Sequence, residues 1–186
     1  MRRVLGLKEI IIDGFKSFSE RTKISFCNGI NAIVGPNGCG KSNIVDGFLW
    51  CLGQQSAKTL RASSMQDVIF AGSLKRKAHS MAEVTVVLSN ENGLLPIEFQ
   101  EVAITRRLYR DGESEYLINK QAVRLKDIIE LLAHTGVGKE AFAVIGQGKV
   151  SEVISQSPQD RRTLFEEVAG ISHFLIKRKE SERKLE

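Results

Sequence analysis

Hydrophobic and polar positions change their period several times along the chain, and each change predicts a different element. Residues 7–18 and 21–26 are two β-type runs separated by polar residues, and the second alternates between apolar and polar positions, which is typical of two strands joined by a turn. The compact apolar run at residues 30–34 predicts a strand buried on both faces. From residue 42 the apolar period becomes helical, and we expect a helix with one apolar face. That face would comprise Ile44, Val45, Phe48, Leu49 and Leu52.

The β-type pattern returns in the middle of the chain. Residues 82–93 alternate and stop at an Asn-Glu-Asn-Gly turn, and residues 102–109 and 115–119 predict a hairpin. Residues 125–138 have helical spacing again, and residues 142–150 are a strand candidate interrupted by two glycines. The expected order is therefore strands, a helix, more strands and a second helix.

The last thirty residues differ in character from the rest. Ser157 and Pro158 are typical of a helix start, because serine caps the first turn and proline is preadapted to the first helical position. Leu164, Val168 and Ile171 then follow at spacings of a coiled-coil seam, although the charged residues 177–186 continue that seam only in part. We expect the start of a long helix, and hence a fragment of a longer protein.

Composition limits the class of protein without deciding it. Hydrophobic residues make up 42% of the 186 residues and charged residues 26%, and no apolar run approaches the roughly 18 residues of a membrane span. We expect no signal peptide and no membrane anchor. The three cysteines lack the spacing of a zinc site or a disulfide framework, which favours the reducing cytoplasm. The net charge of +5 permits contact with nucleic acid.

A glycine-rich stretch, "GPNGCGKS", lies between the apolar run at residues 30–34 and the predicted helix. It satisfies the G-x-x-x-x-G-K-[ST] pattern in the strand-to-helix context that the pattern requires. Its glycines let backbone amides face a polyphosphate, Lys41 would reach the terminal phosphates, and Ser42 would offer its hydroxyl to Mg²⁺. An ordinary glycine-rich turn is the simpler alternative. The sequence therefore predicts a phosphate-binding loop.

Proteins that hydrolyse a nucleotide on a phosphate-binding loop also need a hydrophobic strand that ends in an acidic residue, which supports the metal and polarises water. The strongest apolar strand, "VTVVL", is followed by Ser89 and Asn90, neither of which is acidic. Asp67 lies next to a different apolar run, but it precedes that run instead of ending it. Part of the hydrolytic machinery is therefore missing from this chain.

Several further stretches, in order along nearly the whole chain, carry a resemblance to a known family. They are "DGFKSF", "GPNGCGKSN", "LRASSMQDVIFAGS", "YLINKQAVRLKDI", "VIGQGKV" and "RRTLFEEVAGISHFLIKRKE". Together they resemble the N-terminal head half of bacterial SMC proteins, the chromosome-organising ATPases. The resemblance implies an α/β fold: the N-terminal half of a P-loop ABC-type ATPase head at residues 1–156, with mixed or antiparallel strands, and the start of a coiled-coil arm at residues 157–186. The acidic strand and the signature motif would belong to a C-terminal half.

The resemblance also assigns roles to single residues. Gln147 resembles the Q-loop glutamine, which can touch both Mg²⁺ and the attacking water, and Arg61 resembles an arginine near the γ-phosphate. Lys41, Gln147 and Arg61 are thus the expected catalytic residues, and Ser42 and Gln147 the expected metal ligands. Each could instead be a solvated loop residue. The residues expected to hold ATP are Gly35, Pro36, Asn37, Gly38, Cys39, Gly40, Lys41, Ser42, Asn43, Lys16, Ser17, Gln66, Asp67 and Val68.

The implied partners are the C-terminal half of the same head, a second SMC head in a homodimer, DNA and kleisin-type accessory subunits, with no membrane. The implied cofactors are ATP and Mg²⁺, and the implied cycle couples head engagement to DNA entrapment or loop formation in the nucleoid. Basic residues that could meet DNA phosphates, or could simply be solvated, are Lys58, Lys75, Arg76, Lys77 and Lys120.

Three other functions stay open: a DNA-repair ATPase with a split head, a single-domain P-loop kinase, and a binding module without activity. The kinase is disfavoured by the missing acidic strand and the charged final helix. Cys39 adds a hypothesis of its own. It lies just before a helix N-terminus and near Lys41, surroundings that promote thiol reactivity, so its alkylation or oxidation would block nucleotide binding.

Overall fold

The computed structural model of the chain describes residues 5–133 and residues 155, 157, 162 and 182. The chain divides into two compact units, Met1–Ile128 and Ile129–Glu186. The predicted boundary after residue 156 stays a prediction, because residue 156 and most residues beyond it lie outside the described part. The elements are β1 (Gly6–Asp13), β2 (Thr22–Ser25), α1 (Lys41–Cys51), the 3-10 helix η1 (Met65–Val68), β3 (Met81–Ser89), β4 (Glu101–Tyr109), β5 (Ser114–Ile118), β6 (Gln121–Val123) and α2 (Leu125–Ala133).

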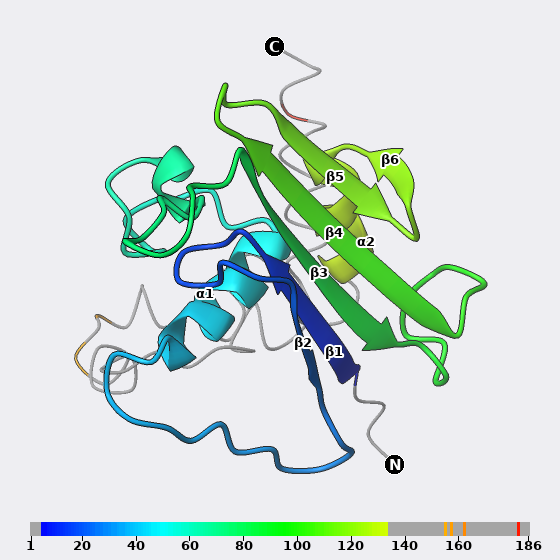
Figure 1. Cartoon of the computed structure of the whole chain (residues 1–186). Helices are drawn as coiled ribbons and strands as arrows, with labels where there is room; N and C mark the ends of the chain where they lie inside the picture. Colours follow the sequence, from blue (N-terminus) through cyan, green and yellow to red (C-terminus); the bar gives the residue numbers. More distant parts are fainter. Residues whose placement is uncertain (1–4, 134–154, 156, 158–161, 163–181, 183–186) are drawn as a thin grey trace. The chain divides into compact units, whose positions relative to one another are not determined.

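The strands form one antiparallel sheet in the order β2-β1-β3-β4-β5-β6 (Figure 1). The two central strands pair without interruption from Met81 opposite Tyr109 to Ser89 opposite Glu101. The predicted β1–β2 pair and the predicted β4–β5 hairpin are both confirmed. The sheet therefore brings together segments separated by almost a hundred residues of sequence.

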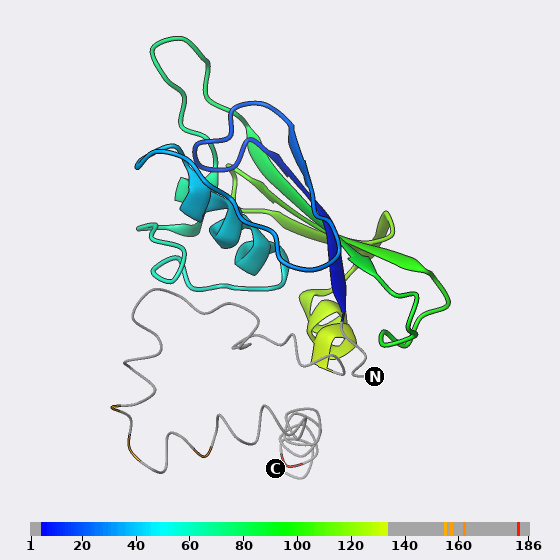
Figure 2. The same ribbon diagram turned by 90° about the horizontal axis from the view of Figure 1, so that it is seen from below.

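Alternation along the two central strands places one set of side chains in the core. In β3 every second residue from Ala82 to Leu88 is buried, and in β4 every second residue from Val102 to Leu108. Helix α1 packs on β1, β3 and β4 and covers this face of the sheet (Figure 2). The site that begins at the first residue of α1 is thus supported by a helix and a sheet.

The face that α1 buries differs from the predicted one except at Leu52, which is buried. Val45 is 43% exposed, and Ile44, Phe48 and Leu49 are only half-buried. Gly47 explains the difference, because α1 packs on the sheet at this position, where even a methyl group would already contact Ile12 and Val84 at 3.6 Å and a larger side chain would hold the helix away. The buried residues within α1 are Asp46, Gly47, Trp50 and Cys51.

Arg106 occupies an inward-facing position of β4 and is 2% exposed. Its Nη1 donates to the carbonyls of Trp50 at 2.9 Å and Gln54 at 2.7 Å, which lie at the C-terminal end of α1. Its guanidinium carbon lies 4.7 Å from the centre of the Trp50 ring and 5.1 Å from that of Tyr116. A cation at this end of a helix binds the carbonyl groups there and complements the helix dipole. Arg106 therefore fixes α1 to the sheet.

The predicted buried strand at residues 30–34 is wrong. These residues have no strand assignment, and Ile30, Ile33 and Val34 are 102%, 45% and 86% exposed. The segment follows β2 as a long connection to α1 (Figure 1). A strand buried on both faces needs a neighbouring strand, and the sheet formed by the described residues provides none beside this segment.

The second predicted helix is confirmed as α2 for residues 125–133, and residues 134–138 lie outside the described part. The strand candidate at residues 142–150 and Gln147 also lie outside it. In the predicted C-terminal helix, the described residues Arg162 and Glu182 are helical. Within the described residues, no helix is long and apolar enough to cross a membrane.

Candidate phosphate-binding site

The glycine-rich loop leads directly into α1. Gly38 and Gly40 have φ angles of 81° and 94°, a region that other residues enter only at a cost. Gly40 is the N-cap of α1, where no side chain caps the helix and the first turn contains no acidic residue. The amide groups and positive dipole end of the helix are thus left for an external anion. This geometry fits a phosphate group.

Lys41 folds back over its own loop. Its Nζ donates to the carbonyls of Gly35 at 2.7 Å and Pro36 at 2.6 Å, and it lies 3.7 Å from the Sγ of Cys39. The neighbouring Ser42 is exposed in the first turn of α1. The structure therefore brings together an ammonium group, a free hydroxyl and a helix N-terminus, the three groups that the motif predicts.

Ser17 forms a wall against the phosphate loop. Its Oγ accepts a hydrogen bond of 2.8 Å from Nδ2 of Asn43, and a Cβ added to Gly40 would lie 2.7 Å from the same oxygen. Ser17 is followed by Phe18, whose amide donates to the carbonyl of Phe15 at 2.8 Å and closes the turn. Ser17, one of the residues expected to hold ATP, thus lies against the phosphate loop, and its contact makes glycine necessary at position 40.

Lys16 and Arg61 meet on one buried carboxylate that the sequence did not single out. The Nζ of Lys16 and the Nη2 of Arg61 both donate to Oδ2 of Asp46, the latter at 2.5 Å. Lys16 also donates to the carbonyl of Leu60. The side chain of Asp46 is 7% exposed, that of Lys16 12% and that of Arg61 55%. The ammonium group of Lys16 is therefore buried against Asp46 and the Leu60 carbonyl, whereas much of the Arg61 side chain remains exposed to solvent.

Arg61 lies at a backbone position that usually belongs to glycine. The amide of Ala62 donates to the carbonyl of Ala57 at 2.9 Å, and the amide of Arg61 donates to that of Lys58 at 3.0 Å. These two bonds are the Schellman pattern that ends a helical turn, with Arg61 at its left-handed position and a φ angle of 55°. An arginine here is explained by its side chain, which reaches Asp46.

Gln66, Asp67 and Val68, which are among the residues expected to hold ATP, form most of η1. The carboxylate of Asp67 accepts from the amides of Ser63 at 3.1 Å and Ser64 at 2.7 Å, and these hydrogen bonds lower the pKa of Asp67. Val68 is fully buried, and its carbonyl accepts the Lys16 amide at 2.7 Å. Gln66 is exposed. The geometry thus connects η1 to the residue 16–18 turn, while Asp67 caps its own helix.

Within the described residues, no group of His, Cys, Asp and Glu could hold a metal ion by itself. The donor set fits Mg²⁺ only in the P-loop manner, in which the Ser42 hydroxyl shares the ion with nucleotide phosphates. Gln147, the other predicted metal ligand, lies outside the described residues.

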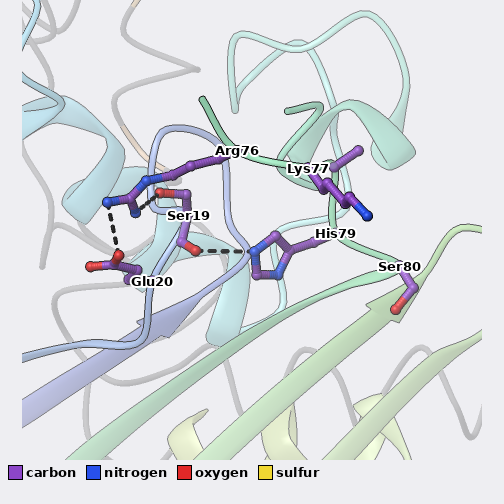
Figure 3. Close-up of a pocket in the computed structure, with 7 residues that line it drawn as sticks. Ser19, Glu20, Arg76, Lys77, His79 and Ser80 are labelled. Carbon is purple, nitrogen blue, oxygen red and sulfur yellow. Dashed lines mark hydrogen bonds and ion pairs between the residues drawn. The ribbon is translucent and has the colours of Figure 1, made fainter. Parts of the chain in front are cut away.

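Two residues of the basic segment 75–77, Arg76 and Lys77, line a shallow hollow together with Ser19, Glu20 and His79 (Figure 3). Arg76 pairs with Glu20 at 2.8 Å and donates to the Oγ of Ser19 at 2.5 Å, and Nε2 of His79 lies 3.0 Å from the Ser19 carbonyl. The charge of Arg76 is thus largely offset by Glu20. Among the described residues, no ion pair involves its neighbours Lys75 and Lys77.

Comparison with known proteins identifies the family. Residues 6–169 match the family described as RecF/RecN/SMC N terminal domain. The chain belongs to this family. It is 54% identical over 179 residues to the chromosome partition protein Smc of Bacillus subtilis (strain 168), and 51% identical over 180 residues to that of Desulfitobacterium hafniense (strain Y51). The matches cover 96% and 97% of this chain but 15% of each relative, at its N-terminal end.

Solved structures of the family agree with the fold. A Pyrococcus furiosus Smc head domain, described as bound to the C-terminal domain of ScpA, matches with a TM-score of 0.85 and 36% identity. That match covers 98% of this chain and 46% of the other. A protein described in terms of ATP-driven dimerization of SMC ATPases matches with a TM-score of 0.79 and 37% identity. That match covers 87% of this chain and 98% of the other. A RecF–ATP complex matches with a TM-score of 0.58 and 21% identity, a likeness that shows a common fold and nothing more. The predicted α/β head fold of SMC proteins is therefore confirmed.

Asp46 is the residue that sequence reasoning missed. The available signal was an acidic residue inside an otherwise apolar helix, only five positions after Lys41. Such a carboxylate is rarely buried without a partner. Its partners, however, come from two loops, and no spacing along the chain reveals that Lys16 and Arg61 meet there.

Proposed function

We propose that this chain is the ATP-binding half of a chromosome partition ATPase head. The observation that carries the proposal is the phosphate loop: two glycines with left-handed φ angles, an uncapped helix N-terminus and the Lys41 ammonium held over the same loop. Membership of the family and the 54% identity to a chromosome partition protein favour this nucleotide site over a generic anion site.

The residues of the loop have distinct roles in this proposal. Backbone amides at the start of α1 bind and orient the phosphates, and Lys41 leaves the carbonyls of Gly35 and Pro36 to contact the terminal ones. The Ser42 hydroxyl binds Mg²⁺, which supplies charge neutralisation when it is bound. Arg61 and Gln147 are proposed to act at the γ-phosphate and at the attacking water.

Hydrolysis is proposed to need two further parts. The first is the C-terminal half of the head, which would supply the acidic strand that the sequence lacks. The exposed apolar side chains of Ile30, Ile33, Val34 and Val45 support this part, since a partner covering them would remove apolar surface from water. The second is a signature motif from another head in a homodimer. ATP-driven engagement and release of the two heads would then drive DNA entrapment or loop formation.

The remaining partners and the location follow from the same proposal. A kleisin-type accessory subunit is supported by the head domain described as bound to ScpA. Contact with DNA is supported by the net charge of +5 and by the basic residues at positions 58, 75, 77 and 120. The expected location is the cytoplasm, in association with the nucleoid.

A DNA-repair ATPase is the second candidate. The RecF structures favour it only as far as a common fold reaches, because their identity of 21% is far below that of the chromosome partition proteins. A P-loop kinase would transfer phosphate as a single chain, and a pure binding module would show no turnover even when assembled.

The test uses a head assembled from this chain and the C-terminal head half. We expect ATP binding by calorimetry and DNA-stimulated ATP hydrolysis, both lost in Lys41→Ala. Lys75→Ala is the matched control: it removes a lysine outside the loop and should keep ATP affinity. ATP hydrolysis by this chain alone, lost in Lys41→Ala, would contradict the split head, and phosphate transfer to an acceptor would favour the kinase.

A further inference from the structure

Two cationic side chains contact Asp46, whose single negative charge can neutralise only one of them. One carboxylate of charge −1 accepts from two cations, Lys16 and Arg61, through the same oxygen. The side chains of Asp46 and Lys16 are 7% and 12% exposed, so little solvent screens their attraction. The three side chains leave a net charge of +1, and Arg61 at 55% exposure is where that charge meets solvent.

Backbone conformation marks the same two cations. Four non-glycine residues among those described have positive φ angles. Asn119 and Lys120 form the two-residue turn between β5 and β6, where such angles are the rule. The other two are Lys16 at 51°, in the two-residue turn between Phe15 and Phe18, and Arg61 at 55°, in the Schellman turn that ends at Ala62. Left-handed backbone is disfavoured for residues with a side chain, and such residues concentrate at functional sites.

The cluster lies close to the phosphate loop. Asp46 is five residues beyond Lys41 on α1, about 7–8 Å along the helix axis. Ser17, the neighbour of Lys16, contacts Gly40 and Asn43 at the start of the same helix. A guanidinium anchored on Asp46 through one nitrogen is therefore within an arginine's length of the loop.

We propose that Asp46 is a positioning residue that holds Arg61 toward the terminal phosphate of the bound nucleotide, with Lys16 as the internal counterion that fixes the Asp46 side chain in place. This inference rests on the proposed ATP site. Arg61 contacts Asp46 through Nη2, and its solvent-exposed part is left for an anion that completes the charge balance. The γ-phosphate, present in ATP and absent in ADP, is that anion.

The test compares ATP and ADP affinities in the assembled head. Asp46→Asn alone would leave the Lys16 ammonium buried without its counterion and could unfold the protein, so the key variant is Lys16→Met/Asp46→Asn, which removes both charges of the buried pair. Arg61→Gly removes the arginine side chain and suits the left-handed backbone. The triple variant combines all three changes. Glu83→Gln/Arg107→Met, which removes another part-buried ion pair, is the matched control.

We expect Arg61→Gly to reduce the preference for ATP over ADP by about tenfold, and Lys16→Met/Asp46→Asn to reduce it by a similar factor. The triple variant should lose no more than either, because Asp46 acts through Arg61. The rate of hydrolysis at saturating ATP should follow the same pattern, and the control variant should keep both values.

The outcomes separate this inference from the proposed function. A wild-type head that binds no ATP, or binds it equally well in Lys41→Ala, would overturn both. A head with Lys41-dependent binding whose Lys16→Met/Asp46→Asn variant keeps its preference for ATP would overturn the role of Asp46 alone. Losses that multiply in the triple variant would also overturn it, since they would mean that the buried pair and Arg61 act separately.

Discussion

Arg106 of β4 and Trp50 of α1 are joined twice, by a hydrogen bond of 2.9 Å from Nη1 to the Trp50 carbonyl and by the guanidinium over the indole ring. The bond lies at the C-terminal end of α1, and the phosphate loop lies at its N-terminal end. The sheet thus sets the position of the helix that presents its amides to a phosphate. Burial lowers the pKa of Arg106, whose charge is nonetheless retained because arginine starts from so high a value.

Arg106→Met should lower the free energy of unfolding by about 1–3 kcal/mol, because it removes the guanidinium donor to the Gln54 carbonyl and leaves the Trp50 carbonyl only its bond from the Gly53 amide. Arg107→Met is the matched control on the opposite face of the same strand. It removes part-exposed ion pairs with Glu83 and Glu115 and should cost less than about 1 kcal/mol. Urea denaturation measures both, and equal losses would contradict the anchoring role of Arg106.

Gly47→Ala should stabilise the head by about 0.5–1 kcal/mol, since alanine is the better helix former. A methyl group at this position would lie 3.6 Å from Ile12 and Val84 and 3.7 Å from Phe15, which are ordinary contact distances. The melting temperature should rise. Gly40→Ala is the contrasting variant, because its methyl group would lie 2.7 Å from the Ser17 hydroxyl, and it should lose ATP binding.

Alkylation of Cys39 with N-ethylmaleimide should lower ATP affinity by about tenfold or more, on the order expected for an added group inside the phosphate loop. The thiol is exposed, lies 3.7 Å from the Lys41 Nζ and faces Gly35, where an added Cβ would be 3.0 Å from the sulfur. Cys39→Ser should bind ATP and resist the reagent, whereas Cys27→Ser, which removes the other exposed thiol, should remain sensitive. A Cys39→Ser protein as sensitive as the parent would refute the hypothesis.

Cys51 should stay unlabelled in the folded head, because burial raises the pKa of its thiol to about 12 from 9.0. The unfolded thiol releases its proton at lower pH than the folded one. Its contribution to stability is therefore complete below pH 9.0 and declines as pH rises toward about 12, by at most about 1.4 kcal/mol per pH unit. Cys51→Ala should lack this part of the pH dependence, which denaturation at several alkaline pH values would show.

Lys75→Glu/Lys77→Glu should weaken binding of duplex DNA. The plot of log affinity against log salt concentration should also become less steep, by about one unit of slope for each phosphate that the protein no longer neutralises. Arg76→Gln is the control, because Figure 3 shows Arg76 already paired with Glu20 and Ser19. Fluorescence anisotropy at several salt concentrations would measure the effect. An unchanged slope in the double variant would place the DNA-binding surface elsewhere on the head.

Local patterns predicted the strands β1 to β5, both helices and the phosphate loop, because alternation and glycine spacing depend only on residues that are close in sequence. They failed where the outcome depends on contacts distant in sequence. Residues 30–34 have the composition of a buried strand but no strand beside them among the described residues. Most of the buried face of α1 was mistaken because the helix packs on the sheet at one small residue, Gly47, which the apolar spacing does not reveal. Asp46 was missed because its two partners come from separate loops.

The exposed segment at residues 30–34 connects directly to the phosphate loop, so in the proposed head the same few residues would serve assembly and nucleotide binding. Two binding events that share a segment are thermodynamically coupled, and the coupling is reciprocal. If the C-terminal half increases the affinity of this chain for ATP by some factor, ATP must increase the affinity between the two halves by the same factor. ATP would then strengthen the association within one head before it brings two heads together.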